Sequence, residues 1–124
     1  MVIPPFRATV AEIGSRIALV SVSGELDLYV EGELRQALEA ADLLGVPTVV
    51  VDLSGVTFMD STVCGILVSE ARRRRRDEGA LVLVSNGTRT GRILELAGID
   101  QIVPVHPTLH AAFQALLVEP EPAQ

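Results

Sequence analysis

The sequence predicts a single α/β domain, with a mixed β-sheet covered by about four helices. Short apolar, β-branched runs alternate with stretches of helical periodicity from residue 30 onward, which is the pattern of repeated strand–helix units. Such units have parallel strands joined by right-handed crossovers. Two segments with the two-residue periodicity of strands precede them and predict an antiparallel hairpin at one edge of the sheet. We expect the domain to cover residues 1–118 and a mobile tail to follow at 119–124.

The hairpin is expected from residues 5–13 and 16–23, which flank the turn signal Gly14-Ser15. The first helix is expected from about residue 30, and Gly45 ends it. Its apolar residues recur at helical spacing: Val30, Leu34, Ala37, Leu38, Ala41 and Leu44.

The remaining elements continue the alternation. They are a strand at 48–53, a helix at 61–78 ended by Gly79, a strand at 80–85, a short helix around 93–97, a short last strand at 101–103 and a helix after Pro107. The strands at 48–53 and 80–85 are apolar at nearly every position, as expected when both faces of a parallel sheet are covered.

Composition narrows the class of protein. Hydrophobic residues make up 48% of the 124 positions, which is enough for a packed core. The net charge of -6 argues against general binding to nucleic acid or to anionic membranes. No apolar run approaches the roughly 20 residues that span a bilayer, and the N-terminus lacks a secretory signal pattern. We therefore expect neither nucleic-acid binding nor membrane insertion.

The single cysteine, Cys64, excludes an internal disulfide and two-cysteine zinc patterns, and a reducing, cytoplasmic setting is expected. Its simplest role is that of a small apolar residue. The only histidines, His106 and His110, lie near the last helix, where we expect solvated surface roles. No nucleophile elbow surrounds Ser61 and no ligand spacing recurs, so we expect no catalysis, no metal and no cofactor.

The segment 59–65 is the main candidate site, because it joins a buried strand to a helix. Unpaired backbone N–H groups and the positive end of the helix dipole lie at such a junction. Asp60 or Ser61 serves as an N-cap, or Ser61 is an exposed hydroxyl that is modified or bound. Gly65 falls in the second turn, where glycine costs roughly 1 kcal/mol relative to alanine. A neighbouring strand or a partner is therefore expected to approach the backbone there.

Two other motifs attract attention. The five arginines at 72–76 point in all directions around a helix end, which favours a solvated helix over a single binding stripe; a docking patch for an acidic protein is the competing hypothesis. The segment 86–92 superficially resembles a phosphate loop but lacks the lysine of a Walker motif. Thr90 as the cap of the short helix is the better account.

Four groups of residues together resemble the STAS domain, the family of anti-sigma factor antagonists and of the related domains in sulfate transporters. They are Gly24-Glu25-Leu26-Asp27, Glu33-Leu34, Val51-Asp52-Leu53-Ser54-Gly55-Val56 with Phe58-Met59-Asp60-Ser61-Thr62, and Leu94-Glu95-Leu96-Ala97-Gly98-Ile99. The resemblance covers residues 6–117 and implies the fold deduced above. With no transporter segment attached, it favours the free-standing antagonist type.

In that type, a serine that corresponds to Ser61 is phosphorylated by an anti-sigma factor that is itself a kinase of the GHKL ATPase class. The unphosphorylated protein binds the anti-sigma factor and frees a sigma factor. Phosphorylation breaks the complex, and a metal-dependent Ser/Thr phosphatase restores it. The resemblance thus implies a substrate and ligand rather than an enzyme, with Thr62 as a second acceptor. It leaves open whether the free domain forms a weak homodimer.

The residues that the resemblance implies in partner binding are Asp27, Met59, Asp60, Ser61, Thr62, Val63 and Cys64. The family often reads Asp-Ser-Ser/Thr-Gly-Leu-Gly, but here Val63 replaces the first of those glycines and Cys64 the leucine. A β-branched side chain beside the acceptor can crowd a kinase. The alternative is therefore a non-phosphorylated STAS scaffold in a signalling or lipid-transport complex, and the segment 86–92 keeps a nucleotide-binding module as a third hypothesis.

Overall fold

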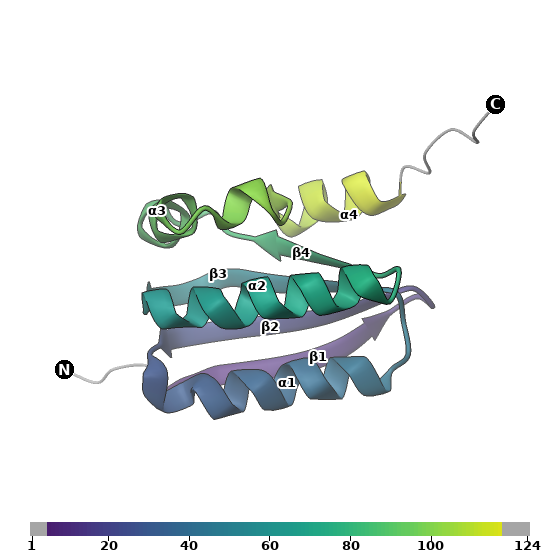
Figure 1. Ribbon diagram of the computed structural model, residues 1–124, viewed down its shortest axis with the longest axis horizontal. Helices are drawn as coiled ribbons and strands as arrows, with labels where there is room; N and C mark the ends of the chain where they lie inside the picture. The colour runs from purple at the N-terminus through teal and green to yellow at the C-terminus, as the bar shows by residue number, and fades with distance from the viewer. Residues whose placement is uncertain (1–4, 118–124) are drawn as a thin grey trace.

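The computed structural model describes residues 5–117, apart from the side chain of Thr88. The tail expected at 119–124 lies outside the described residues. Within them the chain forms a five-stranded sheet in the order β1-β2-β3-β4-β5, of which β1 to β4 can be followed in Figure 1. The strands are β1 (Arg7–Ile13), β2 (Ile17–Leu26), β3 (Thr48–Met59), β4 (Ala80–Val84) and β5 (Val105–His106). Only β1 pairs antiparallel, so the mixed sheet and the edge hairpin are confirmed.

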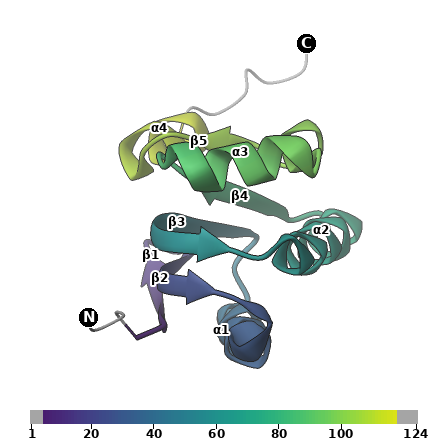
Figure 2. The ribbon, with the colours of Figure 1, turned by 90° about the vertical axis from the view of Figure 1, so that its left-hand side faces the viewer.

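The helices divide unequally between the two faces of the sheet. They are α1 (Glu31–Leu43), α2 (Ser61–Arg76), α3 (Thr88–Leu96) and α4 (Leu109–Leu117), with short 3-10 turns η1 (Leu28–Val30) and η2 (Ile99–Gln101). Neighbouring strands follow one another in the sequence, so right-handed crossovers bring α1, α2 and α3 to the same face. The helix α4 packs on the opposite face (Figure 2).

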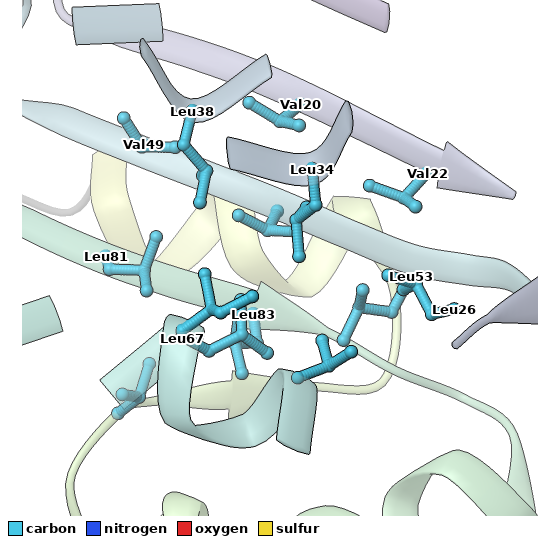
Figure 3. Close-up of a cluster of buried hydrophobic side chains, with 14 of the residues drawn as sticks. Val20, Val22, Leu26, Leu34, Leu38, Val49, Leu53, Leu67, Leu81 and Leu83 are labelled. Atoms are coloured by element: carbon cyan, nitrogen blue, oxygen red, sulfur yellow. The ribbon is translucent and has the colours of Figure 1, made fainter. Parts of the chain in front are cut away.

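The main core lies between the sheet and the first three helices. Alternate residues of β2 and β3 point into it, and they meet leucines of α1, α2 and β4 (Figure 3). Fully buried side chains include Leu26, Leu34, Leu53, Leu67 and Leu83. At about 25 cal/mol per Å² of apolar surface removed from water, this layer is the chief source of stability. The face expected for the first helix therefore packs at Leu34, Ala37, Leu38 and Ala41, but Leu44 lies just after α1 and is 38% exposed.

Two strand predictions differ from the structure. The third strand continues six residues beyond the expected end at residue 53, because Gly55 lets it lie close to β2: a Cβ at Gly55 would come within 2.8 Å of the Cβ of Ser23. The last strand is not residues 101–103. Ile99 is buried at the start of the 3-10 turn η2, Val103 is buried just after it, and the last strand is the two-residue β5.

Two helix predictions were also wrong in detail. The N-cap of α3 is Gly87, without a side-chain cap, while Thr90 is buried inside the first turn. The run 72–76 is not uniformly solvated, because the side chain of Arg74 is only 7% exposed and pairs with Asp42 and Glu70. Within residues 5–117, no helix is long and apolar enough to cross a membrane.

Candidate functional site

The candidate site lies where β2 and β3 end side by side. The two strands are parallel, and Leu26 pairs with Met59 at the last position of their register. The backbone N–H of Asp60 then donates to the carbonyl of Leu26 at 2.8 Å. Both strands lead into helical turns at their carboxyl ends, which face the viewer in Figure 2. Asp27 and Asp60, the residues that follow the strands, are therefore brought together at this end of the sheet.

Asp60 is the N-cap of α2. Its backbone is extended, and its Oδ1 accepts from the backbone N–H of Thr62 at 2.9 Å. The same oxygen accepts from the hydroxyl of Thr62 at 3.0 Å. The cap satisfies one of the N–H groups that a helix start leaves unpaired. Of the two residues considered for this role, Asp60 performs it, so Ser61 is not needed as a cap.

Ser61 is the first residue of α2, and it is exposed. Its hydroxyl lies at the positive end of the helix dipole, where an added anion is favourable by roughly 0.3–1 kcal/mol. Thr62 is also exposed, but its hydroxyl donates a hydrogen bond to Asp60. Of the two adjacent hydroxyls, Ser61 is therefore the one at the solvent boundary that takes no part in the cap.

Three of the residues implied in partner binding lie beneath this surface. Met59, Val63 and Cys64 are 1%, 0% and 4% exposed and belong to the main core. They position the start of α2 by packing, and in this structure their side chains do not reach the surface. Burial also raises the pKa of the Cys64 thiol, and the nearby negative charge of Asp60 raises this pKa further. The side chain of Val63 therefore lies in the core and not on the surface beside Ser61, where its shape was expected to crowd a kinase.

Gly65 has open space around it. A Cβ built there would meet no heavy atom within 4 Å, and the residue is exposed. The close approach of a neighbouring strand, one of the two explanations considered for this glycine, is therefore ruled out within the described residues. The other explanation, an external partner, stays a prediction.

The exposure of the apolar residues beside Asp27 is not predicted by the sequence. The carboxylate of Asp27 accepts from the N–H of Tyr29 at 3.0 Å and so forms the short turn η1. This turn holds Leu28 and Tyr29 outward, 57% and 86% exposed. Phe58 on β3, opposite Glu25 of β2, is also exposed. The only tyrosine of the sequence, two residues after Asp27 in a strand-to-helix connection, was the available signal.

Other candidate residues do not join this site. His110 is exposed on α4 and His106 belongs to β5, on the far side of β4 from β3. Across residues 5–117, no group of three or more His, Cys, Asp or Glu side chains is arranged to hold a metal ion. The segment 86–92 comprises the end of the connection from β4 and the first half of α3.

The fold itself is shared by known anti-sigma factor antagonists. An antagonist from Mycobacterium paratuberculosis superposes with a TM-score of 0.83 at 32% identity, over 90% of this chain and 93% of that one. The antagonist SpoIIAA, in its unphosphorylated form, superposes with a TM-score of 0.74 over 89% of this chain and 96% of that one. At 17% identity, the second comparison concerns the fold alone.

Sequence comparison defines the family. The model of the STAS domain matches residues 8–112, and the chain belongs to this family. Among curated proteins, the anti-sigma-B factor antagonist of Staphylococcus aureus is 31% identical over 87 residues, or 70% of this chain and 81% of that protein. The antagonist of the same name from Listeria monocytogenes is 30% identical over 86 residues, or 69% of this chain and 75% of that protein.

Proposed function

We propose that the chain is an anti-sigma factor antagonist controlled by phosphorylation at Ser61. Its unphosphorylated form binds an anti-sigma factor, a kinase of the GHKL class, and thereby frees a sigma factor. The kinase transfers the γ-phosphoryl group of ATP to the Ser61 oxygen, which loses its proton as ADP leaves. A Ser/Thr phosphatase hydrolyses the phosphoserine and restores binding. The chain acts in the cytoplasm as ligand and substrate, not as an enzyme.

The exposed Ser61 hydroxyl at a helix start capped by its neighbour is the observation that carries this proposal. Because Asp60 supplies the cap, Ser61 is free to be modified without loss of the hydrogen bond that starts α2. The names of the relatives from Staphylococcus and Listeria support the same assignment. SpoIIAA, which shares the fold, has been solved in both an unphosphorylated and a phosphorylated form.

The local charges explain how one phosphate separates the partners. A phosphoserine carries about -1.5 to -2 charges at pH 7. The helix dipole favours that charge, whereas Asp60 beside it and Asp27 on the neighbouring strand end oppose it. These effects offset each other within the domain, so the fold survives. At the interface, bulk and repulsion act without such compensation, and a loss of about 3 kcal/mol weakens affinity more than a hundredfold.

Exposed apolar residues supply the contact area that a protein partner needs. Tyr29 and Leu28 project from η1 beside Asp27, and Phe58 is exposed on the neighbouring strand. Tyrosine is enriched among the residues that dominate protein interfaces. We include Asp27, Asp60, Ser61, Thr62 and Tyr29 in the partner surface, with Met59, Val63 and Cys64 as its buried support.

Site mapping tests the proposal. The chain is incubated with ATP and each GHKL-type anti-sigma factor of the organism that encodes it, and phosphosites are located by mass spectrometry. We expect one phosphate, on Ser61, that Ser61→Ala abolishes and that Thr62→Ala and Ser15→Ala leave in place. Ser15 is the control because it is an exposed serine in the turn between β1 and β2, outside the partner surface. Binding to a kinase without any modification of Ser61 contradicts the proposal.

A further inference from the structure

The five arginines at the end of α2 differ in their contacts. Arg73 and Arg74 turn toward α1 and form ion pairs with Asp42 and Glu70. Arg72 and Arg76 are exposed, and neither forms an ion pair with any residue in the range 5–117. Arg75 is exposed too and forms no ion pair there, but its guanidinium donates to the backbone carbonyl of Ile102 at 3.1 Å. In a chain of net charge -6, Arg72 and Arg76 are thus two exposed cations that form neither kind of contact with residues 5–117.

A groove lies beside these charges. It has a volume of about 330 Å³ and runs between α1 and α2. Its walls combine apolar, polar and charged side chains: Leu38 and Glu39 from α1, and Ile66, Ser69, Arg73 and Arg76 from α2. The residues Ile66 and Ser69 lie one to two helical turns after Ser61, so the groove continues the proposed partner surface along the same helix.

One exposed line of residues connects the two ends of α2. Ser61, Gly65, Ser69, Arg72 and Arg76 are all exposed and recur three or four positions apart, which places them on one side of the helix. At 1.5 Å per residue, Arg72 lies about 16 Å and Arg76 about 22 Å along the axis from Ser61. The acceptor end carries Asp60 and neighbours Asp27, so this line is negative at one end and positive at the other.

We infer that the anti-sigma factor lies along this side of α2, fills the groove between α1 and α2, and presents acidic side chains to Arg72 and Arg76. The inference rests on the proposed function and specifies the surface and the charge of the partner. The polarity along α2 fixes the orientation of the partner, because a reversed partner would bring acidic groups to Asp60 and Asp27. Gly65, about one helical turn after Ser61 on this line, allows the partner backbone to approach closely.

Added bulk at Gly65 tests the close approach. A Cβ there meets no heavy atom within 4 Å, the position is exposed, and leucine replaces a poor helix former, so the melting temperature of Gly65→Leu should equal or exceed that of the wild type. We expect the Kd for the anti-sigma factor to rise roughly tenfold or more, because the side chain occupies the place of the partner. Ala40→Leu is the control, since Ala40 lines a separate groove between α1 and β1. An affinity of Gly65→Leu within about twofold of the control overturns the inference.

Charge removal tests the polarity. The double variant Arg72→Gln/Arg76→Gln should weaken binding roughly fivefold or more and reduce the dependence of Kd on salt. The matched control is Arg7→Gln/Arg16→Gln, which removes two exposed arginines from the hairpin at the sheet edge. Equal losses in the two double variants contradict the assigned orientation.

The outcomes separate this inference from the proposed function. If the wild type binds the anti-sigma factor and Ser61→Asp weakens that binding, the proposed function stands, and the Gly65 and arginine variants decide the inference alone. If the wild type binds none of the GHKL-type anti-sigma factors of its organism at micromolar concentration, both are wrong.

Discussion

Arg74 on α2 forms an ion pair with Asp42 on α1, and its side chain is only 7% exposed. The Nε of Arg74 also donates to Glu70 at 3.1 Å. Arg73 shares both acids, and its hydrogen bonds to Asp42 and then to Glu70 raise its pKa beyond the usual arginine range. These two arginines and two carboxylates thus form a network of ion pairs that joins α2 to α1.

Removal of Arg74 should therefore destabilise the domain. Breaking a fully buried ion pair costs roughly 3–5 kcal/mol. We expect about 2 kcal/mol for Arg74→Ala, because Arg73 remains to neutralise Asp42 and Glu70, and because Asp42 is one-third exposed. Urea unfolding monitored by circular dichroism measures the change. Arg76→Ala, at an exposed position, should change stability by less than about 0.5 kcal/mol. Equal effects of the two variants would contradict the network.

Removal of the N-cap of α2 should lower the free energy of unfolding by less than removal of Arg74. Asp60→Ala removes the acceptor for the N–H and the hydroxyl of Thr62 and should cost about 1 kcal/mol of unfolding free energy. Asp60→Ser retains a capping oxygen and should recover most of that loss. Thermal denaturation of both variants provides the measurement. An Asp60→Ala protein as stable as the wild type would show that the cap is dispensable.

Two glycines on either side of the arginine run should respond in opposite directions. A Cβ at Gly79 would lie 2.5 Å from the backbone oxygen of Pro47, which cannot move without shifting β3. Gly79→Ala should therefore destabilise the domain by about 1–3 kcal/mol. Gly65→Ala meets open space within a helix and should stabilise it by up to about 1 kcal/mol. Chemical denaturation of the two variants side by side tests the contrast, and a loss of stability in both would refute it.

Cys64 should be unreactive in the folded protein. Its side chain is 4% exposed, and burial raises the pKa of the thiol, so little thiolate forms at neutral pH. Since the unfolded chain releases this proton at lower pH than the fold, stability should fall as pH rises past the ordinary range of a thiol. A colorimetric thiol reagent at pH 8 should label Cys64 only after denaturant is added. Fast labelling of the native protein would contradict the burial.

Most of the architecture was accessible from the sequence, because periodicity reports which faces are buried. Leu34, Ala37, Leu38 and Ala41 were assigned to one face of a helix, and all four are buried. The order of strands and helices and the antiparallel hairpin were likewise confirmed. These features depend on local patterns that a single segment carries.

The features that were missed depend on contacts between distant segments. Nothing local distinguishes Arg74 from Arg72, since only the approach of Asp42 from α1 makes burial of the charge tolerable. The β3 strand continues past Ser54-Gly55 because Gly55 lies opposite Ser23 of β2, where a Cβ would clash. The exposure of Ser61 was foreseen only as one of two alternatives, and the observed cap by Asp60 decided between them.

The most direct test compares the affinity of the unphosphorylated and Ser61-phosphorylated chains for the same anti-sigma factor by isothermal titration calorimetry. We predict that phosphorylation raises Kd more than about a hundredfold, equivalent to about 3 kcal/mol, while the melting temperature of the free chain changes by no more than a few degrees. Equal affinity of the two forms would contradict the account, because the phosphate at Ser61 would then not control the partner.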